Sequence, residues 1–288
     1  YGRNETTSFH YVETLNLIGN GLDSITSIAQ ALEHPHCYTK SLLMGRNEHL
    51  GDDSAVQIAN LIGNEKSHSL TWLSLDDTSV SSRGASELYR SIGNRPSEPF
   101  SYLSLSYMKK THLFLWTFRN SVTRSFSNLH QIKNQLQELS LTGNALTDDD
   151  MKELTTAILQ TNITSLHLND NHIGPRGVSY LSELVRQEQL VELNLARNRR
   201  IGNDGILILA EALRGDNRVT TLWLNDCRIG QEGAEALLSL FPDNTQLEFI
   251  TLNNSNKGTG SGIEPNTTKA LQDALQKNQR QKESKNEI

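Results

Sequence analysis

One stretch decides the fold of this chain: ITSLHLNDNHIGPRGVSYL, residues 163–181. Its first half fits the frame L-x-x-L-x-L-x-x-N-x-L, in which apolar and polar residues alternate around Leu166 and Leu168. Such alternation predicts a short β-strand, because successive side chains of a strand point to opposite faces. Apolar residues then recur at helical spacing from Gly177 to Leu181. The stretch therefore predicts a strand, a turn and a helix.

The same frame recurs along the whole chain. The second leucine of the L-x-L pair is occupied in turn by Leu17, Met44, Leu75, Leu105, Leu141, Leu168, Leu195, Leu224 and Leu252. The intervals run from 27 to 36 residues, a period typical of solenoids. A helix returns the chain after each strand, so successive strands must be parallel. Strands about 4.8 Å apart and helices about 8–10 Å apart force the stack to curve, with the sheet on its inner face.

Two copies carry a more specific signature. Residues 166–181 and 222–237 share N/C-x-I-G-x-x-G-A/V-x-x-L. This pattern resembles the ribonuclease-inhibitor-like class of leucine-rich repeat proteins, which includes ribonuclease inhibitor, the sensor domains of NOD-like receptors and Ran GTPase-activating protein. The resemblance covers about residues 12–255. It implies an α/β fold, a right-handed leucine-rich repeat solenoid (horseshoe) with a parallel concave β-sheet and convex helices.

The class serves many partners, so the resemblance says less about function than about fold. It implies a protein-binding scaffold without enzymatic activity. One alternative is a GTPase-activating protein resembling the Ran activator, although the tail from Lys277 on is not acidic as in that protein. Another is a structural segment of a larger protein of the NOD-like receptor type.

Three regions are predicted from the repeat. Residues 1–11 form a lead-in that looks truncated, residues 12–255 form a solenoid of about nine units, and residues 256–288 form a loop, a capping helix and a frayed tail. The capping helix is expected at residues 267–276, where apolar residues follow helical spacing, and fraying is expected from Arg280 on.

One interval breaks the rhythm. The 36 residues between Leu105 and Leu141 indicate an irregular insertion near residues 109–120, which contains Trp116 and Phe118. Three interpretations stay open: an apolar protrusion that docks a partner, a segment folded over the solenoid, and an error in a gene model.

The asparagine of the frame has a physical role. The chain turns sharply after each strand, and an Asn side chain can both donate to and accept from the backbone groups left unpaired there. Leaving such a buried group bare costs about 1–3 kcal/mol. Cys227 replaces this Asn in one unit, and we interpret it as a small buried residue with a weak donor.

Composition and charge exclude little by themselves. Hydrophobic residues make up 36% of the 288 residues and the net charge is −6, so neither nucleic acid nor a membrane is indicated as a partner. The two cysteines, Cys37 and Cys227, are too few for a disulfide scaffold and favour a reducing compartment, the cytoplasm or the nucleus, of which the cytoplasm is predicted. Four N-glycosylation patterns are attributed to chance in an Asn-rich chain; they begin at Asn4, Asn162, Asn253 and Asn266.

Clusters with catalytic or metal-binding side chains have simpler explanations. The acidic runs at residues 148–150 and 76–77 follow strands, where carboxylates cap helix N-termini or line a loop, and capping is the preferred interpretation. Residues 34–37 lack a second cluster at zinc-site spacing, and residues 257–262 lack the order of a phosphate-binding loop. We therefore predict no catalytic, cofactor-binding or metal-binding residues.

The strand residues that flank each leucine should point away from the core and line the concave face. This face is the predicted partner-binding surface, formed by Trp72, Asp76, Tyr102, Glu138, His167, Asn169, Glu192, Asn194, Trp223, Asn225 and Phe249. Exposed aromatic residues are common interface anchors, and the acids favour a basic protein partner. Arg197, Arg199 and Arg200 are expected to form a separate positive spot on one rim. The chain is expected to act as a monomer.

Overall fold

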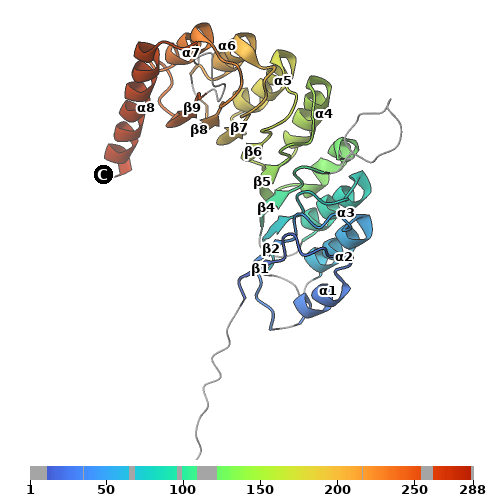
Figure 1. Ribbon diagram of the computed structural model, residues 1–288. Coiled ribbons are helices and arrows are strands. Elements are labelled where there is room, and N and C mark those ends of the chain that lie inside the picture. The colour runs from blue at the N-terminus through green and yellow to red at the C-terminus, as the bar shows by residue number, and fades with distance from the viewer. Residues whose placement is uncertain are drawn as a thin grey trace, which may run out of the picture.

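The computed structural model describes residues 12–34, 36–64, 69–95, 99–108, 122–215, 217–253 and 262–286. Nine strands lie within these ranges and form one sheet in chain order, with every neighbouring pair parallel (Figure 1). They are β1 Thr14–Asn16, β2 Ser41–Leu43, β3 Trp72–Ser74, β4 Phe100–Ser104, β5 Leu136–Ser140, β6 Ser165–His167, β7 Glu192–Asn194, β8 Thr221–Trp223 and β9 Phe249–Thr251.

The helices lie outside the sheet and follow the same order. They are α1 Thr26–Leu32, α2 Asp52–Gly63, α3 Ser82–Gly93, the 3₁₀ helix η1 Thr123–Ile132, α4 Asp148–Ile158, α5 Pro175–Arg186, α6 Gly202–Ala212, α7 Gln231–Leu238 and α8 Pro265–Asn286. Successive helices pack against each other on the outer side of an arc, while the strands line its inner side (Figure 1). The predicted α/β solenoid with a parallel sheet is confirmed.

A single apolar spine runs through the stack. The first leucine of each L-x-L pair is in register with its neighbours, so that Leu139 pairs with Leu103 on one side and Leu166 on the other. All three side chains are fully buried. The helices close the core from the outer side with residues such as Leu88 and Leu181. Each unit thus buries its apolar face only because its neighbours cover it.

The asparagines bridge adjacent units as the sequence predicts. Asn171 Nδ2 donates to the carbonyl oxygens of Leu168 at 2.8 Å and of Leu141, one unit earlier, at 3.1 Å. Its Oδ1 accepts from the amides of Asn144 and Leu146, both at 2.9 Å. Cys227 takes the same place and donates from Sγ to the Leu195 carbonyl at 3.1 Å, which matches its expected role as a weak donor.

The helix starts are also bridged between units. Asp148 Oδ1 accepts from the amide of Gly174 at 2.6 Å, at the start of the next helix. Asp150 accepts from the amide of Thr147 and caps its own helix. The predicted capping by residues 148–150 is confirmed, but the prediction for residues 76–77 is wrong. These two residues lie in the turn after β3, and α3 begins at Ser82 with Ser81 as its N-cap.

The irregular unit differs from the others. Its outer segment is the 3₁₀ helix η1, in which Phe126, Leu129 and Ile132 are buried. The predicted insertion at residues 109–120, with Trp116 and Phe118, lies outside the described residues.

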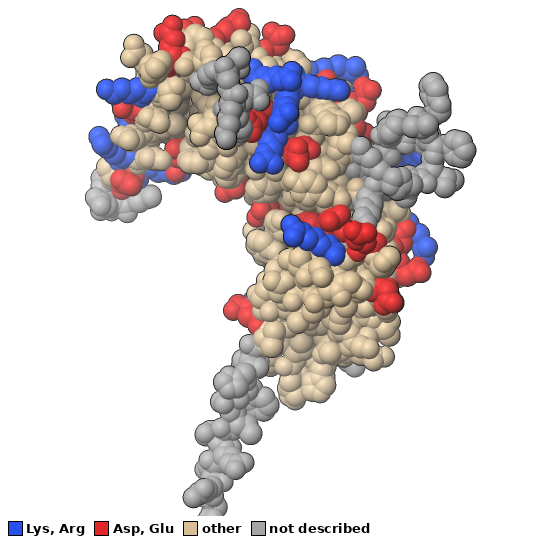
Figure 2. Space-filling model, in the orientation of Figure 1, with Lys and Arg blue, Asp and Glu red and all other residues tan. Residues whose placement is uncertain are grey.

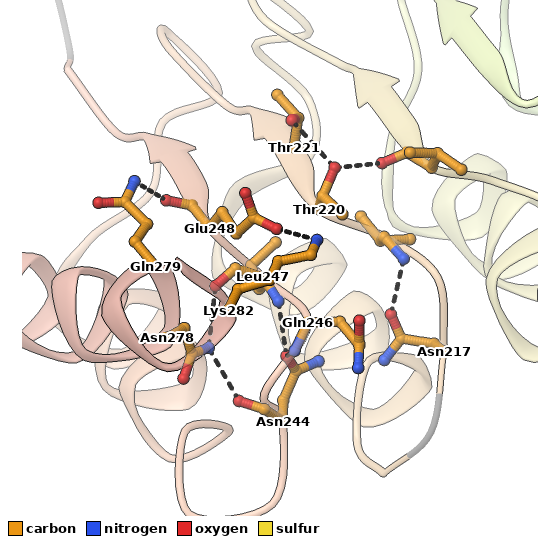
Figure 3. Close-up of polar contacts among 12 residues, drawn as sticks. Asn217, Thr220, Thr221, Asn244, Gln246, Leu247, Glu248, Asn278, Gln279 and Lys282 are labelled. Carbon is orange, nitrogen blue, oxygen red and sulfur yellow. Dashed lines mark hydrogen bonds and ion pairs between the residues drawn. The ribbon is translucent and has the colours of Figure 1, made fainter. Parts of the chain in front are cut away.

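The C-terminal helix is longer than the sequence predicts. Instead of ending near residue 276 and fraying from Arg280, α8 continues to Asn286. Its polar residues explain the extension, since Asn278 donates to the carbonyls of Asn244 and Leu247 at 3.1 and 2.9 Å, and Gln279 donates to the Glu248 carbonyl at 2.9 Å (Figure 3). A polar helix face thus satisfies backbone groups that another unit would otherwise satisfy.

Candidate binding surface on the inner face

The sheet register places the predicted surface residues in two rows that flank the leucine spine. One row contains Ser41, Trp72, Tyr102, Glu138, Ser165, Glu192, Thr221 and Phe249. The other contains Ser74, Ser104, Ser140, His167, Asn194, Trp223 and Thr251. Asp76, Asn169 and Asn225 stand two residues beyond the last strand residues of β3, β6 and β8. All eleven predicted residues therefore lie on or beside the inner face.

Two aromatic side chains form a platform on β3 and β4. The rings of Trp72 and Tyr102 are stacked, with centroids 3.9 Å apart and an interplanar angle of 21°. Trp72 remains 37% exposed. Burial raises the pKa of the Tyr102 hydroxyl, and the nearby carboxylates of Asp76 and Glu138 raise it further. The platform thus combines apolar surface with a negative field.

A second aromatic group lies toward the C-terminal end of the sheet. The Trp223 ring lies 5.9 Å from the His167 ring and 6.1 Å from the Phe249 ring, which meets it edge-on. Phe249 is 44% exposed. His167 Nε2 also lies 2.7 Å from Glu138 Oε1, which connects this group to the centre of the sheet. We call Trp72 with Tyr102 the first aromatic cluster, and His167, Trp223 and Phe249 the second.

Small hydroxyl residues form the floor near the first cluster. Asp76 accepts from the Ser106 amide at 2.9 Å and from the hydroxyls of Ser74 and Ser104. The hydrogen bonds continue from Ser106 across the sheet, through Ser140 and Thr142, to Asn169. These contacts occupy Asp76 and hold the floor in one arrangement.

The predicted asparagines are also engaged within the sheet. Asn169 Oδ1 accepts from Thr142 at 2.7 Å, Asn194 Oδ1 accepts from the Ala196 amide at 3.1 Å, and Asn225 Oδ1 accepts from the Asn253 amide at 3.0 Å. Glu192 Oε2 accepts from the Ser165 hydroxyl at 3.3 Å. Among the predicted residues, the aromatic residues and Glu192 are therefore the ones whose side chains contribute least to the hydrogen bonds within the sheet.

Sequence reasoning missed Tyr107, which follows β4. Its side chain is 45% exposed, and its hydroxyl donates to Asp170 Oδ2 at 3.2 Å, two units away. The ring lies over Gly143, where an added Cβ would come within 2.2 Å of it. Its sequence position was a signal: Tyr107, for which the structure has a φ of 53°, stands just before the turn residue of the frame, Met108.

No metal or redox chemistry follows from the described residues. In the ranges that the structure describes, no group of three or more His, Cys, Asp or Glu residues could hold a metal ion. His34 and His36 have ring centroids 5.5 Å apart, but no further ligand-type residue completes a group there. No helix among the described residues is long and apolar enough to cross a membrane.

The comparisons with known proteins agree with this architecture. A family model described as "Leucine Rich repeat" matches residues 134–154, 160–182, 189–210 and 218–238. The leucine-rich repeat-containing protein LegL7 from Legionella pneumophila is similar in structure, with a TM-score of 0.52 and 20% identity, covering 93% of this chain and 92% of that one. At this identity the likeness concerns the fold alone.

Two further structures are similar over shorter stretches. An internalin from Listeria monocytogenes has 17% identity and a TM-score of 0.44, covering 87% of this chain and 65% of that one. The actin-binding site 2 of leiomodin-1 has 15% identity and a TM-score of 0.41, covering 71% of this chain and 92% of that one. Among curated proteins no significant match was found.

Proposed function

Because this chain is a leucine-rich repeat protein, we propose that it is a non-enzymatic scaffold that binds another protein on the inner face of its sheet. The observation that carries the proposal is the pair of aromatic clusters on that face. Parallel pairing on both sides fixes the backbone of β4 and β8. Rings presented on such a backbone lose little entropy on binding, which is why exposed Trp and Tyr are frequent hot spots.

The spacing of the clusters sets the size of the partner segment. Tyr102 on β4 and Trp223 on β8 are four strand intervals apart. At about 4.8 Å per interval, they are roughly 19 Å apart along the sheet. An extended peptide rises about 3.3 Å per residue, so about six residues would separate its two anchors.

The charge between the clusters sets the chemistry of the partner. Glu138 and Glu192 lie in the same row as Trp72, and both remain partly exposed. A partner with Lys or Arg between two apolar anchors would meet these carboxylates. We therefore propose a basic segment, and complementarity of this kind contributes to specificity and to the association rate.

A peptide-display selection on the purified protein tests the proposal. We expect enriched peptides with two aromatic or aliphatic anchors and basic residues between them. Trp72→Ala combined with Trp223→Ala should weaken their binding by at least about tenfold, as expected for hot-spot residues. The matched control combines Leu159→Ala and Leu207→Ala, which remove exposed apolar side chains from the helical side.

The outcome is decided by comparing the two double variants. Equal loss in both, or full binding by the tryptophan variant, would exclude the inner face as the binding surface. Thermal unfolding of each variant checks that the fold is intact. Because both tryptophans are partly exposed, we expect their removal to change stability little.

The cysteines support a proposal for the compartment. Cys37 and Cys227 are both free thiols, and Cys227 is fully buried. A chain that keeps unpaired thiols suits a reducing compartment, and we propose the cytoplasm. Fractionation of cells expressing the tagged full-length protein checks this, and an N-glycan on Asn162, Asn253 or Asn266 would contradict it.

A further inference from the structure

Four arginines gather at the carboxyl ends of β7 and β8. Arg197, Arg199 and Arg200 follow β7, and Arg228 follows β8; all four are exposed. We call them the arginine rim. Figure 2 shows basic side chains grouped over this part of the molecule, on the face where the strands end. The positive spot expected from the three arginines of one unit is thus enlarged by a residue from the next unit.

The arginines of the rim form no ion pair with another described residue. On the helical side, by contrast, exposed arginines pair with acids: Arg176 lies 2.6 Å from Asp149, and Arg214 lies 3.0 Å from Glu211. Four guanidinium groups therefore remain available to a ligand.

We propose that the arginine rim binds an acidic segment of a protein, rich in Asp or Glu. Guanidinium groups pair with carboxylates through two parallel hydrogen bonds, and a mobile acidic segment can reach several of them at once. The rim is too small for nucleic acid, since binding driven by phosphate contacts typically uses about 6–10 of them. This site is separate from the aromatic clusters and does not rest on the proposed function.

The test uses fluorescein-labelled octaglutamate as the probe, with octalysine and an oligothymidine of equal charge as comparisons. Fluorescence anisotropy at low salt should show saturable binding of octaglutamate to the full chain, and octalysine binding should not weaken when the rim arginines are replaced. The rim variant carries Arg→Gln at positions 197, 199, 200 and 228, and should bind at least about tenfold more weakly. The control variant carries Arg→Gln at positions 83, 176, 186 and 214 on the helical side, which changes the net charge equally; it should stay within about twofold of the unchanged protein.

Three results would overturn the proposal: no binding of octaglutamate, equal loss in the rim and control variants, or tighter binding of oligothymidine than of octaglutamate. Unchanged octaglutamate binding by Trp72→Ala with Trp223→Ala is expected. That variant separates the two surfaces, because failure of the inner-face proposal would leave the rim result untouched. Thermal unfolding confirms that each variant is folded, and exposed arginines should be removable without loss of the fold.

Discussion

At the scale of single residues, neighbouring units are held together by buried polar side chains at one position of the frame. Asn171 makes contacts with the backbone of its own unit and of the unit before it. Its partners are buried, so water cannot replace the lost contacts when the side chain is shortened. The energetic role of this residue therefore exceeds what one polar side chain usually contributes.

We expect Asn171→Ala to lower the free energy of unfolding by roughly 2–4 kcal/mol, because several buried backbone groups lose their partner. Urea denaturation followed by circular dichroism measures the change. Asn162→Ala, at an exposed position of the same unit, is the control and should shift stability by less than about 0.5 kcal/mol. An equally small shift for Asn171→Ala would show that the bridging contacts make no net contribution to the free energy of unfolding.

Cys227, which replaces the frame asparagine in another unit, should make the free energy of unfolding depend on pH. Burial raises the pKa of Cys227 to about 12. The unfolded thiol ionises at lower pH, so the folded state disfavours the thiolate. This residue's contribution to stability is therefore full below about pH 9 and is lost as the pH rises toward 12.

Titration with a thiol reagent at pH 8 should accordingly label one cysteine quickly and the second only after unfolding. Cys37 is the partly exposed one, so Cys37→Ser should abolish the fast phase. Rapid labelling of the folded Cys37→Ser variant would contradict the burial of Cys227.

At the scale of elements, α3 and the 3₁₀ helix η1 approach each other closely at a glycine. Gly93 ends α3, and a Cβ built on it would lie 1.6 Å from the Gln131 carbonyl oxygen and 3.2 Å from the Ile132 Cα. Both atoms belong to the backbone, so neither can move away as a side chain would. The irregular unit thus depends on a glycine in the helix before it.

Gly93→Ala should therefore destabilise the protein by about 3 kcal/mol or more, at the upper end of overpacking costs. Gly63→Ala is a matched control, since Gly63 ends α2 at the equivalent position and its nearest neighbour, Ser91 Oγ, is 3.7 Å from the added Cβ. Differential scanning calorimetry compares the two. Equal melting temperatures for the two variants would mean that the α3 and η1 backbones separate without cost.

At the scale of the whole molecule, the array is stabilised by contacts between nearest neighbours. A unit in the middle is covered on both sides, whereas a unit at the end is covered on one. Leu139 in β5 is fully buried, while its equivalent in β1, Leu15, is only partly buried. The same residue at the same position of the frame should thus contribute differently.

Leu139→Ala should cost about 3–5 kcal/mol, within the range of large-to-small substitutions in a closed core. Leu15→Ala should cost about 1 kcal/mol, because less apolar surface is buried there. Urea unfolding of both variants gives the comparison. Equal destabilisation by the two substitutions would show that the contribution of a spine leucine to stability does not depend on the position of its unit in the array.

The role of Asp76 and the length of α8 could not be predicted from the sequence, because both depend on polar contacts between units. Apolar periodicity cannot show that Asp76 accepts from Ser104 and Ser106 in the next unit, so its position after a strand wrongly suggested helix capping. Likewise, α8 has few apolar residues near its end, and its extension depends on side chains that bind the Asn244, Leu247 and Glu248 carbonyls (Figure 3).

By itself, the sequence determined the parallel solenoid, the buried spine and the residues of the inner face, because burial along a strand repeats every second residue and is visible in one unit alone. Only the tertiary structure decided which of those residues meet. The stacking of Trp72 on Tyr102 and the hydrogen bond from Tyr107 to Asp170 both join different units. The physical reason is that such contacts depend on register and curvature, which are properties of the stacked units and not of any one of them.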